Sequence, residues 1–231
     1  MCFSANASFG AGIVLAVIGV ATIKKATHHS QIIFASIPLV FCVQQITEGF
    51  LWLALANPGN PVLQQFTTYT FLSFAQIVWP FYVPLAILLL QKKEDRKVIS
   101  KLLVGIGAIV SLYLASCLMS YHVQATIIGY HISYQQDYPS VLSNYVGVLY
   151  IIATITPAFF SGIKHIRYLG AVILISYIMT EILYTDYIVS VWCFFASVIS
   201  IIVFAIMHEI EKTNKELSTH KGVNFTGKIM K

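Results

Sequence analysis

The chain is poor in charged residues, and residues 49–91 contain none. Charged side chains make up 10% of the 231 residues, whereas a soluble domain carries about a quarter. Hydrophobic residues make up 58%, and the mean hydropathy is +0.78. The composition therefore excludes an ordinary soluble domain and is typical of a membrane protein.

The usual motifs of enzymes and metal sites are also missing. The four cysteines, at positions 2, 42, 117 and 193, form no Cys-x-x-Cys pair. Gly-x-Ser-x-Gly, Walker-type and His-Glu-x-x-His motifs do not occur. The last apolar stretch has no Lys, which excludes a retinal Schiff base at that position. We expect no metal and no cofactor.

Lysine and arginine are confined to four clusters, and every second gap between long apolar stretches has neither. Each apolar stretch is close to the ~20 residues that cross ~30 Å of hydrocarbon. Clusters of Lys and Arg mark the cytoplasmic side. We therefore predict an all-α membrane bundle of seven transmembrane helices, with the N-terminus outside and the C-terminus in the cytoplasm. The clusters span 24–25, 92–101, 164–167 and 212–231, and the apolar stretches span roughly 7–23, 31–56, 68–90, 98–120, 143–163, 168–185 and 187–207.

The prediction divides the chain into a transmembrane domain, residues 1–208, and a polar cytoplasmic tail, residues 209–231, that frays. The basic loops flank apolar spans, where they meet anionic lipid headgroups, so the expected partner is the lipid bilayer and not nucleic acid. One connection is long, residues 121–142. Its β-branched and aromatic residues around Gly129 favour a small hairpin or an interfacial cap over disorder.

Small residues recur every four positions in the first and fourth apolar stretches. Such stripes let helices approach closely in lipid. Pro80 and Pro84 in the third stretch remove backbone donors, which favours a kink that lines a cavity. The two stripes are Ser8, Gly12 and Ala16, and Gly107, Ser111 and Ala115.

Two glutamates stand within apolar stretches, Glu48 in the second and Glu181 in the sixth. A carboxylate in hydrocarbon costs several kcal/mol unless it is protonated, paired or hydrated, so it usually faces the bundle interior. Gln44, Glu48 and Trp52 follow one another at four-residue spacing on one helix face. We expect a polar pocket around Glu48. A protonated Glu48 that joins two helices by hydrogen bonds fits the same pattern, and Glu181 fits a solvated helix end.

The predicted pocket lies in the outer half of the bundle, between the second, third, sixth and seventh helices. Glutamines would supply its polar contacts, and tryptophans its walls. The expected ligand is a small solute or a lipid-like molecule, which the protein binds and, in one version, transports. The predicted ligand-binding residues are Gln44, Gln45, Glu48, Trp52, Gln76, Trp79, Glu181 and Trp192.

Three motifs resemble those of an uncharacterised family of small bacterial multi-pass membrane proteins. They are Met1-Cys2-Phe3-Ser4-Ala5 at the start, Gln45-x-x-Glu48-Gly49-x-x-Trp52 in the second helix, and Val191-Trp192-Cys193 in the last. The resemblance implies a place in the bacterial inner membrane, but it carries no activity.

A weaker signal is internal, since Thr47-Glu48 and Thr180-Glu181 stand at corresponding places in the second and sixth helices. This match suggests a three-plus-one-plus-three arrangement with parallel repeats, similar to sugar transporters of the SWEET type.

Two other interpretations of the function stay open. Removal of Met1 would leave Cys2 as a nucleophile beside its own amine, which suits a membrane-embedded enzyme acting on a lipid or an amide. A sensory or accessory subunit would depend on a partner for its activity. The sequence decides neither whether the chain is an enzyme nor whether it forms a homo-oligomer.

Overall fold

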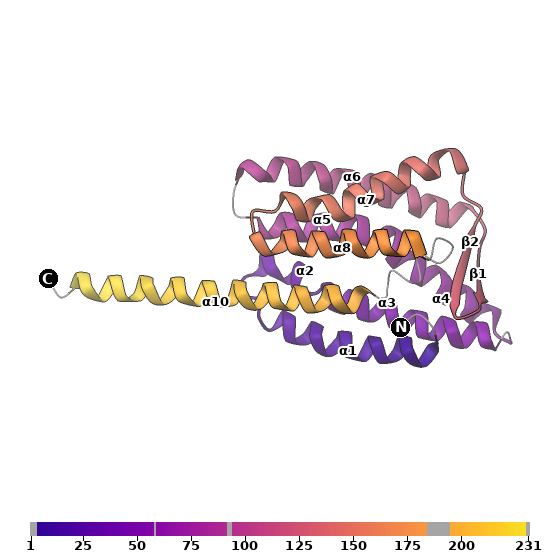
Figure 1. The fold of residues 1–231 in the computed structure, drawn as a ribbon, viewed down its shortest axis with the longest axis horizontal. Coiled ribbons are helices and arrows are strands. Elements are labelled where there is room, and N and C mark those ends of the chain that lie inside the picture. Colours follow the sequence, from indigo (N-terminus) through magenta and orange to yellow (C-terminus); the bar gives the residue numbers. More distant parts are fainter. Residues whose placement is uncertain (1–3, 58, 92–93, 184–194, 230–231) are drawn as a thin grey trace.

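The structure, a computed structural model, describes residues 4–57, 59–91, 94–183 and 195–229. Within these residues the helices form seven rods packed as a bundle, which confirms the predicted fold class (Figure 1). The rods are α1 (Ala5–Ile23); η1 (His29–Gln31), α2 (Ile32–Ala35) and α3 (Ile37–Ala56); α4 (Pro61–Leu72), η2 (Ser73–Val78) and α5 (Trp79–Leu90); α6 (Glu94–Ser120); α7 (Ser140–Phe160); α8 (Lys164–Leu183); and α10 (Ala196–Ile229).

Five of the rods are long and apolar enough to cross a membrane, by length and composition. They are the first four rods and α8, and α7 adds a shorter apolar helix, Tyr145–Phe160. The last predicted span, 187–207, begins outside the described residues. Local signals set several helix starts. The Ser4 side chain accepts a hydrogen bond from Ala7 N at 3.2 Å, and Asn60 caps α4 just before Pro61.

The long loop contains the hairpin that the sequence predicts. Strand β1 (Val123–Ile128) pairs antiparallel with β2 (His131–Gln136), and Val123 lies opposite Gln136. Gly129 has a φ of 62°, as the first central position of a type II′ turn requires. Ala125 and Ile132 are buried against α3, so the hairpin covers one end of the bundle.

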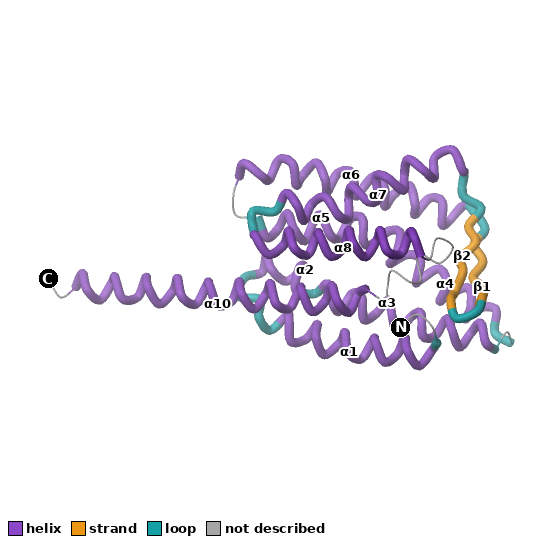
Figure 2. Tube along the Cα trace, viewed as in Figure 1, coloured by secondary structure: helices purple, strands orange, loops and turns teal. Residues whose placement is uncertain are grey.

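The rods close into a ring in which the first and last helices meet. Helix α1 packs on α3, α5 packs on α6 and α7, α7 packs on α8, and α10 contacts α8, α3 and α1. The loops that follow α1 and α7 lie at the end from which α10 projects, and the hairpin lies at the opposite end (Figure 2). The basic clusters therefore gather at one end of the bundle, which we call the basic end.

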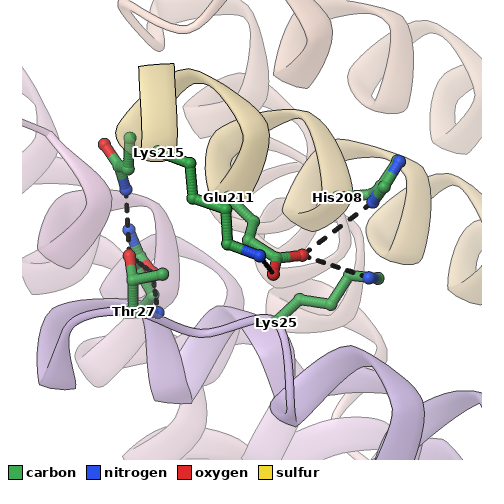
Figure 3. Close-up of polar contacts among 7 residues, drawn as sticks. Lys25, Thr27, His208, Glu211 and Lys215 are labelled. Carbon is green, nitrogen blue, oxygen red and sulfur yellow. Dashed lines mark hydrogen bonds and ion pairs between the residues drawn. The ribbon is translucent and has the colours of Figure 1, made fainter. Parts of the chain in front are cut away.

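Helix α10 continues to Ile229, where we expected a frayed tail. Glu211 accounts for part of this, because it accepts from Lys215 Nζ one turn later at 2.6 Å and pairs with Lys25 Nζ at 3.1 Å (Figure 3). Asn214 Nδ2 also donates to Thr27 Oγ1 at 2.9 Å. These contacts fasten α10 to the loop that follows α1.

Candidate functional site

A cavity of about 310 Å³ lies inside the bundle and reaches the hairpin. We call it the hairpin-side cavity. Its walls come from α2, α3, η2, α5, α6, α7, α8 and α10 and from the residues that end the hairpin. The lining is mostly apolar, and its polar members include Gln44, Gln76, Trp79, Tyr113, Gln136, Tyr138, Tyr150 and Thr154.

A π-helical segment, η2, shapes one wall of this cavity. Trp79 N donates to Phe74 O, five residues back, and Pro80 has no N–H to offer to Ala75 O. Tyr150 Oη on α7 supplies the missing donor to Ala75 O at 2.6 Å. Side chains on neighbouring helices thus satisfy the backbone that the irregular turn leaves open.

Helix α6 contacts the backbone carbonyls of the next turn of this rod in a similar way. Ser111 Oγ donates to Ile77 O at 2.7 Å. The Pro80 carbonyl cannot receive a helical bond from Pro84, and it lies so close to Gly107 that a Cβ there would overlap it. The predicted small stripe on α6 is therefore confirmed as a packing face, and the predicted effect of the prolines on the helix is seen in η2.

Neutral side chains in the cavity lining form two hydrogen-bonded groups. Trp79 Nε1 donates to Gln44 Oε1 at 2.7 Å, and its ring stacks on Phe41 with centroids 4.0 Å apart. Gln76 Nε2 donates to Gln136 Oε1 at 2.8 Å, and Gln76 Oε1 accepts from Tyr138 Oη at 3.1 Å. The first group joins α3 to α5, and the second joins η2 to the hairpin and to the residue that follows it closely.

The tyrosine that donates to Gln76 is protonated at physiological pH, and burial reinforces this. Tyr138 follows the hairpin, outside the membrane-spanning helices. Burial raises the pKa of Tyr138 above its ordinary value, so the hydroxyl stays protonated at physiological pH. The hydrogen bond to Gln76 therefore does not depend on pH in that range.

The lining that the described residues provide contains no Asp, Glu, Lys, Arg or His. A charged ligand would leave water without meeting a counter-ion, which costs several kcal/mol. A neutral amphiphile suits the same surface, because the lining is mostly apolar and its polar side chains are uncharged.

Three of the predicted ligand-binding residues, Gln44, Gln76 and Trp79, meet at this cavity. Gln45, Glu48 and Trp52 are also buried, but they are not part of its lining. Gln45 Nε2 donates to Glu48 Oε2 at 3.1 Å. Gln45 Oε1 and Trp52 Nε1 are buried without a hydrogen-bond partner in the described part of the chain.

The remaining predicted residues lie elsewhere. Glu181 is exposed on α8, where it interacts with Tyr177 one turn before it. In the first Thr-Glu pair the glutamate, Glu48, is fully buried. In the second pair the threonine, Thr180, is buried at 1% exposure and Glu181 is exposed. The two pairs therefore face differently and give no support to the predicted repeat. Trp192 and Cys2 fall outside the described residues.

Comparison with known proteins places the chain in a family. Residues 1–218 match the model of a family of unknown function, DUF6629. The chain belongs to that family. No curated protein and no solved structure matches it. The predicted membership of an uncharacterised family is thus confirmed, and the family supplies no activity.

Several residues of the cavity in this DUF6629 member escaped the sequence analysis. Tyr138, Gln136 and Tyr150 reach Gln76 and Ala75 across 60 or more positions in the sequence. No spacing pattern reports such a contact. Phe41 was within reach, since it precedes Gln44 by three positions and shares its helix face.

Proposed function

We propose that this chain is an integral membrane protein that binds a small neutral amphiphile in the hairpin-side cavity. The ligand would place its polar end at the polar side chains of Gln44, Gln76 and Trp79 and its apolar body among the aliphatic side chains deeper in the bundle. The observation that carries the proposal is the lining itself, which is uncharged over the described residues and mostly apolar, with a few hydrogen-bonding side chains.

The volume supports a ligand of this class. Small-molecule pockets commonly measure about 300–1,000 Å³ and are mostly apolar, with a few placed polar groups. The 310 Å³ of this cavity lies at the lower limit, which suits a single short chain better than a two-chain lipid.

We also propose that the hairpin end faces outward across the bacterial inner membrane and that the basic end faces the cytoplasm. The distribution of Lys and Arg supports this orientation. A reporter fused after Lys231 should report a cytoplasmic location. A cysteine at Tyr130, on the hairpin turn, should react with an impermeant thiol reagent in intact cells. The opposite pattern would invert the orientation and leave the cavity unchanged.

Tryptophan quenching tests the binding proposal, because Trp79 lines the cavity. The probe is decanol with a bromine at the chain end, added to the protein in lipid nanodiscs. The variant is Gly147→Phe, since Gly147 lines the cavity and a Cβ there meets nothing within 4 Å. The matched control is Val148→Phe, a neighbour that is 58% exposed and outside the lining.

We expect saturable quenching in the wild type and in Val148→Phe, and its loss in Gly147→Phe. The saturable part should also vanish in Trp79→Phe, which assigns it to that ring. Quenching that rises linearly with probe and is equal in all variants would reflect partition into lipid only, and the proposal would fail.

A further inference from the structure

A second cavity, of about 410 Å³, lies at the basic end. We call it the basic-side cavity. It lies between η1, the end of α5, the start of α8 and the part of α10 that leaves the bundle. Its polar lining differs from that of the first cavity, since it includes His28 and the pair of His165 Nδ1 and Glu209 Oε2, which are 3.0 Å apart.

The two cavities lie end to end along the same helices. Ala158, near the end of α7, lines the first cavity, and Gly162, in the loop that follows α7, lines the second. On α8, Leu169 lines the first and His165 the second. On α8, four residues of helix rise by ~6 Å, so about one turn separates the cavities on that wall.

The other walls keep the same order. Phe34 lines the first cavity and Gln31, three residues earlier, the second. On α5 the corresponding residues are Ile87 and Leu89. On α10 the gap is wider, from Ile199 to Ile206. Every one of these elements therefore passes from one cavity to the other in the direction of the bundle axis.

The layer between the cavities is apolar and closed. Phe34, Ile87, Ile166 and Val203 are each 0–1% exposed and belong to one cluster of buried side chains. Ile166 and Val203 line neither cavity, so they belong to the separating layer itself. We call these four residues the barrier.

We propose that the two cavities are the two halves of one path through the bundle, closed by the barrier, along which a neutral amphiphile passes between the two sides of the membrane. The nature of the cargo rests on the proposed binding function, whereas the path rests on the alignment of the cavities. An apolar barrier one turn thick excludes ions, because a charge there would be stripped of water. A neutral head crosses it at lower cost.

The test measures the movement of radiolabelled monodecanoylglycerol between leaflets of vesicles that contain the full chain. Albumin added outside extracts the outer pool at once and the inner pool at the rate of movement. The variant Val203→Ala thins the barrier, and Val198→Ala on the same helix, 43% exposed, is the matched control. Ile166→Val is a milder second variant in case Val203→Ala folds poorly. Decylphosphate serves as the charged probe.

We expect wild-type protein to speed extraction of the inner pool above the rate of empty vesicles. Val203→Ala should speed it by a further factor of about ten, which corresponds to a barrier lowered by ~1.4 kcal/mol. Val198→Ala should match the wild type, and decylphosphate should not move. Equal rates in empty vesicles, wild type and both barrier variants would overturn the path, as would faster transfer of decylphosphate.

The failure of this inference can be told from the failure of the binding proposal. If saturable quenching of Trp79 persists but no variant moves the neutral probe, the path is wrong and the cavity remains a binding site. If quenching and movement are both absent, both proposals are wrong.

Discussion

The two sides of α3 differ in how closely their neighbours approach. On the side of α1, Gly12 and Gly49 admit the side chains of Ile46 and Phe9, and a Cβ on either glycine would lie 2.8 or 2.7 Å from them. On the side of α5, the irregular turn η2 with Pro80 and Pro84 gives the neighbouring rod a shape that leaves room for the hairpin-side cavity. One side is packed and the other is hollow.

The polar residues on α3 also differ in their surroundings, although Gln44 and Glu48 share one face of the helix. Gln44 faces the hollow side and binds Trp79, whereas Glu48, one turn later, is 0% exposed and lines neither cavity. A polar residue in an apolar helix therefore shows that something satisfies it, but does not show where a ligand binds. The shape of the neighbouring rod, η2 with α5, indicates where a ligand has room to bind.

The largest expected effect is on the wall of the hollow side. Gly107→Ala should destabilise the protein by ~3 kcal/mol, because the new Cβ would overlap the Pro80 carbonyl and push α6 from α5. Thermal unfolding in detergent measures this. The control is Gly105→Ala on the same helix, where a Cβ meets nothing within 4 Å. Equal unfolding temperatures for the two variants would show that the close approach does not hold the wall.

The next effect concerns Glu48, which is buried outside the cavity lining. Glu48→Leu should cost about 1–3 kcal/mol, because Gln45 Nε2 loses its acceptor in a buried place. Glu48→Gln keeps an acceptor and should cost less. Both variants should retain saturable quenching by bromodecanol. If a well-folded Glu48→Gln lost that quenching, the ligand would lie at Glu48, and the separation of Glu48 from the binding cavity would be wrong.

A smaller effect is expected for the hydrogen bond that completes η2. Tyr150→Phe removes the donor to Ala75 O and should destabilise the protein by about 1 kcal/mol. Tyr145→Phe on the same helix, where the side chain is 71% exposed, is the control. Chemical denaturation of the two variants side by side gives the difference. A Tyr150→Phe variant as stable as Tyr145→Phe would mean that water satisfies the carbonyl instead.

The smallest effect concerns α10, which packs on α1 and also supplies Ile199 to the cavity. Hydrogen bonds from Lys215 and Lys25 lower the pKa of Glu211 from 4.5 to about 2. The folded pKa is the lower one, so this contribution is complete above the unfolded value and is lost as the pH falls through about 2. Exposed ion pairs contribute little, so the effect is modest.

Hydrogen exchange of the amides around Glu211 measures the attachment of α10. Protection should be the same at neutral and mildly acidic pH, and it should fall in Glu211→Gln. Glu216→Gln, on the exposed surface of the same helix, should leave protection unchanged. If mild acid alone removed the protection, a group other than Glu211 would control the attachment.

The sequence predicts the parts of this fold that depend on averages over many residues. Seven apolar stretches and four basic clusters were enough for the rods and for the basic end, and Gly129 with its neighbours was enough for the hairpin. The sequence did not predict η2, because a π-helical turn depends on the donors that Ser111 and Tyr150 bring from other helices. It also could not choose between Gln44 and Glu48, since both lie on one face of the helix and the sequence does not show where along that face the cavity ends.

Photo-crosslinking with decanol that carries a diazirine in its chain tests the central claim most directly, because it reports where the chain of a neutral amphiphile lies. The full-length protein is irradiated in nanodiscs with and without excess unlabelled decanol, and the labelled residues are located by mass spectrometry. The account predicts competable labels on the cavity lining, at residues such as Val83, Ile151 and Ile173. Competable labels on α1 or beside Glu48, or labels confined to lipid-facing residues that excess decanol does not reduce, would contradict it.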